Sequence, residues 1–136
     1  MNKIPCILLV DDDETANYLN FRVLTRSGMV DETLISLNGK EALKIINNRF
    51  GQHGNESTCT APMLVLLDVN MPIMNGLEFM KQFSMLEDNV KLNVKVIALT
   101  TSTHPTDLKM MMGFGVEHFI SKPLKWEELE MILSLN

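Results

Sequence analysis

Five short runs of apolar residues recur along the 136-residue chain, separated by longer stretches whose apolar residues follow helical spacing. The runs are continuously apolar, which is typical of parallel strands that are buried on both faces. Strands are predicted at residues 7–10, 33–37, 63–67, 94–99 and 116–120. Helices are predicted at 15–27, after a cap at Asn38, and at 77–86, 105–115 and 124–135. In the first of them, Leu19, Val23 and Leu24 are expected to share one face. This order predicts an α/β fold, a doubly wound five-stranded parallel sheet with helices on both faces.

The chain has the length of one domain, and we expect a single domain over residues 1–136. No repeat or linker interrupts the pattern, and no output domain is expected after the fifth predicted helix. Residues 49–62 are polar, contain two glycines and are predicted to form a long loop before the third strand. We interpret this loop as a tolerated insertion, with a binding element as the alternative.

The charge and the hydropathy pattern exclude several classes of function. The formal net charge is −5 and no run of Lys or Arg occurs, so nucleic-acid binding is not expected. No window approaches the ~20 apolar residues of a membrane span, so we expect a cytoplasmic protein without membrane contact. Cys6 and Cys59 form no CxxC motif, and His53 with Cys59 falls short of the about four ligands of a closed zinc site.

Polar residues stand where four of the predicted strands end. Asp11 and Asp12 follow the first strand, Asp68 the third, Thr100 the fourth and Lys122 the fifth. Ligands of open parallel sheets bind at the carboxyl ends of the strands. The five side chains are therefore expected to converge on one rim of the sheet.

Three carboxylates on one rim need a compensating charge. At ~4 Å and an effective dielectric of ~20, each ionised pair costs about 4 kcal/mol. Oxygen ligands of this kind favour Mg²⁺, which with Lys122 would attract a phosphoryl group, and Thr100 can donate a hydrogen bond. Asp68 is the best candidate nucleophile because it ends the central predicted strand. Single acids at strand ends also cap helices, as Asp12 or Asp13 could do, but the conjunction of all these residues favours a site.

The segments that carry this pattern resemble the receiver domains of two-component response regulators, particularly stand-alone, CheY-like ones. They are residues 8–13, 66–72, 75–76, 98–100 and 121–123. The resemblance implies a flavodoxin-like (βα)5 fold and a signalling switch that assists only its own phosphorylation and dephosphorylation, so it is not an enzyme in the usual sense.

The resemblance also assigns roles around the phosphorylated residue. It implies that Asp68 is the phosphoacceptor. Mg²⁺ is implied as the cofactor, held by Asp11, Asp12, Asp68 and the backbone carbonyl of Asn70. Asn70 and Ser102 stand where the family tunes the rate of dephosphorylation.

Further roles follow for the residues at the last two strands. Lys122 is similar to the lysine that contacts the phosphoryl group, and the Lys122–Pro123 bond is expected to be cis. Thr100 resembles the switch hydroxyl and Phe119 occupies the switch-aromatic position, which often is Tyr. The hydroxyl that Phe119 lacks weakens the expected coupling, and Thr101 is larger than the residue common at its position.

The implied partners are a sensor histidine kinase or a histidine phosphotransfer protein, and a downstream protein target. Signalling, and possible homodimer formation, is expected through the face of the fourth helix, fifth strand and fifth helix. Residues 110–112 of the fourth helix are all Met, and at ~100° per residue they cannot all face the core.

Competing interpretations differ in what they require of the same residues. A haloacid-dehalogenase-type phosphatase needs a second Asp where Asn70 stands, and a flavodoxin needs a phosphate loop where the chain has acids at 11–13. The remaining alternative is a receiver-like interaction module that acts without phosphorylation.

Overall fold

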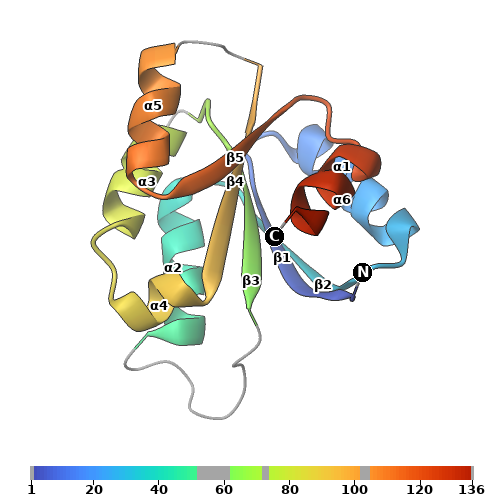
Figure 1. Ribbon diagram of the computed structural model, residues 1–136, viewed down its shortest axis with the longest axis horizontal. Helices are drawn as coiled ribbons and strands as arrows, with labels where there is room; N and C mark the ends of the chain where they lie inside the picture. The colour runs from blue at the N-terminus through green and yellow to red at the C-terminus, as the bar shows by residue number, and fades with distance from the viewer. Residues whose placement is uncertain (1, 52–61, 72–73, 102–104, 136) are drawn as a thin grey trace.

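The computed structural model describes residues 2–51, 62–71, 74–101 and 105–135 of the chain. One parallel sheet contains five strands in the order β2-β1-β3-β4-β5 (Figure 1). The strands are β1 (Ile4–Val10), β2 (Val30–Ser36), β3 (Met63–Asp68), β4 (Val94–Thr100) and β5 (Val116–Ser121). The helices are α1 (Glu14–Ser27), α2 (Gly39–Phe50), α3 (Gly76–Phe83), α4 (Asp88–Leu92), α5 (Pro105–Gly113) and α6 (Trp126–Ser134).

Helices cover both faces of the sheet, so the predicted doubly wound architecture is confirmed (Figure 1). Helices α1 and α6 lie on one face, and α2, α3, α4 and α5 lie on the other. Successive side chains of a strand point to opposite faces. Ile7 and Leu9 of β1 therefore join the core under α1 and α6, whereas Leu8 and Val10 join the larger core on the opposite side.

Short polar side chains cap the helices that follow β1, β2 and β3. Asp13 accepts hydrogen bonds from the backbone N–H groups of Thr15 and Ala16, so the possible cap of the first helix is real. Asn38 caps α2, as predicted, and Asn75 caps α3. Each cap satisfies N–H groups that have no partner within the first turn of a helix. The start of each helix is thereby fixed next to the carboxyl end of the preceding strand.

Three predictions about the elements need correction. Strand β2 begins at Val30 instead of residue 33, and its N-terminal half contains the consecutive exposed acids Asp31 and Glu32, so the strand lacks a continuously apolar run. Helix α2 continues to Phe50, into the predicted loop of residues 49–62, whose residues 52–61 lie outside the described residues. The structure also has a sixth helix, α4, which is too short to produce a periodic signal.

The side of α1 that faces the sheet is another correction. Leu19, which we expected to share one face with Val23 and Leu24, is 56% exposed, whereas Leu24 is fully buried. The polar Asn17, on a different side of the helix from Leu19, is buried instead. Within the described part of the chain, no helix is both long and apolar enough to cross a membrane.

Candidate functional site

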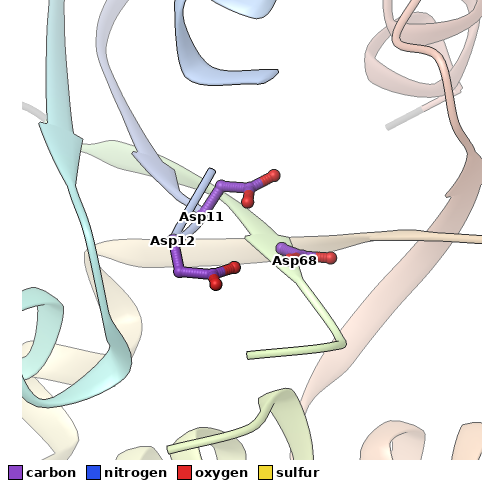
Figure 2. Close-up of side chains that lie close together, drawn as sticks. All are labelled: Asp11, Asp12 and Asp68. Carbon is purple, nitrogen blue, oxygen red and sulfur yellow. The ribbon is translucent and has the colours of Figure 1, made fainter. Parts of the chain in front are cut away.

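Three aspartates meet at the carboxyl ends of the neighbouring strands β1 and β3 (Figure 2). Asp11 directly follows β1, Asp12 comes next, and Asp68 is the last residue of β3. One carboxylate oxygen from each lies within 4.8 Å of the others. Asp11 and Asp68 are buried, while Asp12 is exposed and leaves the cluster open to solvent. The sequence-based prediction that these acids converge agrees with this geometry.

Lys122 joins two of these acids. Its Nζ lies 2.8 Å from Asp68 Oδ1 and 3.3 Å from Asp11 Oδ2. Its backbone N–H donates to the carbonyl of Thr100 at 3.1 Å, which holds the end of β5 against the end of β4. Among the residues that the structure describes, Lys122 is the cation paired with this cluster, so three carboxylates stand against one ammonium group.

Burial raises the pKa of Asp68 above its ordinary value, and the neighbouring charge of Asp11 adds to the effect. The hydrogen bond and charge of Lys122 oppose this increase without cancelling it. For Lys122, burial alone would lower the pKa, but the hydrogen bond and charge of Asp68, together with Asp11, outweigh burial and raise it. The site therefore keeps the ammonium charged and makes an ionised Asp68 costly until further positive charge arrives.

Backbone and side-chain hydrogen bonds hold the acids in place. The N–H of Asp13 donates to Asp11 Oδ1 at 2.9 Å, and the N–H of Asn70 donates to Asp68 Oδ1 at 3.3 Å. Asn17 Nδ2 donates to the Asp11 carbonyl at 2.8 Å from inside α1. Asn17 was not among the predicted site residues. Its spacing of seven from the buried Leu24 was the available signal, because it places both on one helical face.

The turn between β3 and α3 is closed by a tight approach at Gly76. The Gly76 N–H donates to the carbonyl of Val69 at 2.9 Å. A Cβ at position 76 would lie 2.9 Å from the Cα of Val69 and 3.1 Å from the Met111 side chain. Only glycine fits this approach without displacing its neighbours, and the turn that it closes contains Asn70.

The remaining predicted residues lie around the same rim. Thr100 is buried at the end of β4, and Thr101 beside it is exposed. Phe119 in β5 is half-buried and packs against the larger core. The Lys122–Pro123 peptide bond is cis, as the resemblance implied. Ser102 lies outside the described residues.

The donor set fits a hard divalent cation. Three carboxylate oxygens within 4.8 Å of one another, one of them from an exposed side chain, suit Mg²⁺, which keeps part of its water shell. Such an ion would supply the positive charge that the cluster lacks. With the ion held by the acids and Lys122 beside Asp11 and Asp68, the site would present both a metal and an ammonium group to an incoming anion.

Comparisons with known proteins agree with this geometry. Residues 7–134 match the family model described as the response regulator receiver domain, so the chain belongs to that family. It is 33% identical over 125 residues to the probable methanogenesis regulatory protein FilR2 of Methanothrix harundinacea, covering 91% of this chain and 76% of FilR2. The chain spans 10% and 3% of two Dictyostelium discoideum relatives, the hybrid signal transduction histidine kinases K and G.

Solved structures define the type of receiver more closely. A two-component response regulator from Cytophaga hutchinsonii has a TM-score of 0.83 and 27% identity, with 98% of this chain and 97% of that chain covered. The Vibrio cholerae chemotaxis protein CheY4 has a TM-score of 0.74 and 26% identity, with 97% and 98% covered. The chain is therefore a CheY-like receiver of two-component signalling, with the flavodoxin-like fold. Receiver domains are signalling switches and not classical enzymes; they bind Mg²⁺ at clustered acids and interact with histidine kinases or phosphotransfer proteins.

Proposed function

We propose that this receiver is switched by phosphorylation of Asp68 in a reaction that depends on Mg²⁺. The observation that supports the proposal most is the arrangement around Asp68, which lies 2.8 Å from Lys122 and within 4.8 Å of Asp11 and Asp12. Asp11, Asp12, Asp68 and the carbonyl of Asn70 would hold the ion, which would neutralise negative charge on the incoming phosphoryl group.

The transfer takes place between a phosphohistidine and the Asp68 carboxylate. A bond forms between a carboxylate oxygen and phosphorus while the phosphorus–nitrogen bond to the histidine breaks, and no oxidation or reduction occurs. Lys122 holds one phosphoryl oxygen, and the hydroxyl of Thr100 donates to another, because the developing charge is spread over these oxygens. The donor is a sensor histidine kinase or a histidine phosphotransfer protein, in line with the family.

The phosphorylated state signals through the face formed by α5, β5 and α6, which are the fourth predicted helix, the fifth strand and the fifth predicted helix of the sequence. Met110 and Met112 of α5 are 47% and 57% exposed, while Met111 is fully buried, so the expectation that the three methionines cannot all face the core is confirmed. Exposed methionines suit an adaptable surface for a downstream protein or a second copy of the chain. Phe119 lies in β5, the strand of this face, and its packing changes with the position of Thr100. The protein acts in the cytoplasm and needs no contact with nucleic acid or membrane.

The alternative is a receiver-like interaction module that acts without phosphorylation. Such a module has no need of the complete set Asp11, Asp12, Asp68, Thr100 and Lys122 around one buried carboxylate. The costly burial of Asp68, seen in its raised pKa, also favours a chemical role for that carboxylate.

Intact-mass measurement tests the proposal. The purified protein is incubated with Mg²⁺ and acetyl phosphate, alongside Asp68→Asn and the exposed-site control Asp31→Asn. We expect one added phosphoryl group in the wild type and in Asp31→Asn, none in Asp68→Asn, and none in any sample with EDTA. An unmodified wild type that also fails to bind beryllofluoride would contradict the switch and leave the interaction module.

A further inference from the structure

Helices α2 and α3 lie side by side on one face of the sheet (Figure 1), and a groove of about 330 Å³ runs between them. The floor of this α2–α3 groove is apolar, half-buried and packed against the larger core, and it consists of Leu43, Met74 and Leu86. The rims are polar and exposed, and they consist of Lys40, Lys44, Asn47 and Asn48 from α2 and Gln82 from α3. An apolar floor between a few polar groups is the usual form of a binding groove.

Among the described residues, the charged groups that line this groove are all positive. They are Lys40 and Lys44, in a chain whose formal net charge is −5. The two lysines are four residues apart on one face of α2, so their charges repel each other. Lys40 is also the second residue of α2, where the positive end of the helix dipole disfavours a cation. Both charges therefore weaken the helix that carries them.

Neither lysine forms an ion pair within the described part of the chain. Elsewhere in it, a carboxylate lies within 4.0 Å of the ammonium groups of Lys3, Lys91, Lys95 and Lys122. Glu41 follows Lys40 in the sequence but lies on another side of α2, next to Ile35 and Leu37 of the β2 end. Glu78, one turn before Gln82 on α3, is exposed and does not line the groove. Two unpaired cations beside apolar surface fit an occupant that brings carboxylates.

The length and spacing of the groove suit a helix. The residues of α2 that line it extend from Lys40 to Asn48, which is about 12 Å of helix at 1.5 Å per residue. About two turns of a second helix fit along this length. Carboxylates four residues apart on that helix match the spacing of Lys40 and Lys44. Apolar side chains beside them fill the floor, and the amides of Asn47 and Gln82 can donate hydrogen bonds to its polar groups.

Charge argues against other occupants. An anionic membrane surface attracts clusters of about four or more basic residues, and the described lining has two. A nucleic-acid backbone would also meet the exposed Glu78 beside the groove. A symmetric contact between two copies would bring Lys40 and Lys44 of one copy toward the same lysines of the other.

Met74 fixes the end of the groove that is nearest the candidate site. It belongs to the turn between β3 and α3, which follows Asp68. A Cβ at position 39 would lie 3.0 Å from Met74 Sδ, so this side chain packs directly against the backbone at the start of α2. The contact is made without any occupant and keeps this part of the floor in place. A helix in the groove therefore lies beside the rim of the sheet that carries the acid cluster.

We propose that the α2–α3 groove binds an acidic amphipathic helix of a partner protein, with carboxylates four residues apart against Lys40 and Lys44. The groove belongs neither to α1 nor to the face of α5, β5 and α6, and its residues take no part in the proposed phosphoryl transfer. The inference therefore goes beyond the proposed function and can fail while phosphorylation of Asp68 is confirmed.

Heteronuclear NMR of the isotope-labelled protein tests the proposal with two designed helical peptides of identical composition. The first has glutamates at four-residue spacing beside a stripe of leucines, and the second has the same residues in an order that spreads the glutamates around the helix. EDTA is present, so that Mg²⁺ does not bridge the glutamates to the acid cluster. We expect the first peptide to shift the amide signals of Leu43, Lys44, Asn47 and Gln82. It should bind at least about tenfold more tightly than the second peptide.

Charge-reversal variants separate this groove from a general effect of net charge. Lys44→Glu should weaken binding of the first peptide at least about tenfold, and adding Lys40→Glu should weaken it further. Lys81→Glu is the matched control, because it makes the same change in net charge at an exposed lysine of α3 that does not line the groove. It should leave the affinity within about twofold of the wild type, since water and salt screen exposed charges.

Several results would overturn the proposal. They are equal binding of the two peptides, shifts centred on α1 or α5, retained binding by Lys44→Glu, or an equal loss of binding in Lys81→Glu. An absence of binding by either peptide would also overturn it. So would tighter binding to phosphatidylglycerol vesicles than to the first peptide, or the same shifts produced by raising the protein concentration alone.

Discussion

Helices α1 and α3 both continue from a strand that ends in a site acid, yet they bury opposite kinds of side chain. Helix α3 follows β3 and places Phe79, Met80 and Phe83 in the larger core, where each is at most 4% exposed. Helix α1 follows β1 on the other face of the sheet and buries Asn17 together with Leu24 (Figure 1). One helix is held by apolar packing, and the other is held partly by a hydrogen bond to the site.

This difference shows how the two ends of the site are supported. The two phenylalanine rings of α3 stack with centroids 6.2 Å apart, so a rigid apolar helix stands behind Asp68. Behind Asp11 stands a helix whose buried contact to the strand end is the amide of Asn17. Of the apolar side chains that α1 leaves exposed, Tyr18 and Phe21 line a groove beside β2 and Leu19 does not. We infer that the Asp68 side of the site is the fixed part and the Asp11 side is the more adjustable part.

Replacing one phenylalanine by alanine in each helix tests this difference with the largest expected effect on stability. Phe79→Ala removes a fully buried ring and should lower the free energy of unfolding by about 3–5 kcal/mol. Phe21→Ala removes a ring that is 37% exposed and should cost about 1 kcal/mol or less. Urea unfolding of both variants measures the difference. Similar losses would show that α1 is packed as α3 is, and the comparison would fail.

The apolar patterns predicted the sheet but not the orientation of α1. Continuous runs such as residues 63–67 identify buried parallel strands, because few other elements of that length are apolar on both faces. Leu19 was misplaced because periodicity assumes that the apolar side of a helix faces the core, whereas α1 buries the polar Asn17 and exposes Leu19. Helix α4 was missed since its five residues make little more than one turn, and it is held by contacts such as the buried Val90.

Lys122 joins the acid that precedes α1 to the acid that precedes α3, so its removal tests whether both sides serve one reaction. Lys122→Met should slow phosphoryl gain from acetyl phosphate by about 10²–10³-fold, the usual effect of losing one preorganised charge at a developing anion. Initial rates at saturating Mg²⁺ measure this loss. Lys125→Met, at an exposed lysine three residues later, is the control and should react at the wild-type rate. A wild-type rate for Lys122→Met would remove this lysine from the site.

The site was predictable to the extent that its residues stand at strand ends. Asp11, Asp68, Thr100 and Lys122 each end or follow a strand of the parallel sheet, and parallel strands bring such positions to one rim. Asn17 was not predictable from that rule, because it reaches the site from within a helix. Its buried Oδ1, which has no hydrogen-bond partner among the described residues, and the groove beside it depend on how α1 packs against β2, which no local pattern contains.

Asn17 tests the hydrogen-bonded support of α1 directly. Asn17→Ala leaves the buried carbonyl of Asp11 without its 2.8 Å donor and should lower the free energy of unfolding by about 1–3 kcal/mol. If Asn17 positions Asp11, the variant should also bind Mg²⁺ more weakly, and a merely structural role would not change that affinity. Asn20→Ala, at a half-buried residue of the same helix, is the control. Unchanged stability and Mg²⁺ affinity would leave α1 without this link to the site.

Substitution of Asp68 itself should change stability only slightly, and the sign of the change is the informative part. Without metal, the raised pKa means that the folded protein holds the Asp68 proton more tightly than the unfolded chain. Ionised Asp68 therefore costs stability near pH 7, and Asp68→Asn in EDTA should unfold at a temperature about 4 °C higher, equivalent to roughly 1 kcal/mol. As the pH falls through the raised pKa, the wild type becomes neutral at this residue and the difference should close.

Adding Mg²⁺ should reverse the order of the two proteins. A ligand that binds only the folded state stabilises it by about 2.7 kcal/mol at 100 times its dissociation constant, and Asp68→Asn lacks one of the proposed ligands. Thermal unfolding of both proteins across a Mg²⁺ titration measures the crossing. Parallel curves would mean that Asp68 does not bind the ion. A wild type that is already the more stable protein in EDTA would mean that Lys122 alone compensates its buried charge, and the fixed side of the site would then be a complete ion pair that does not need a metal.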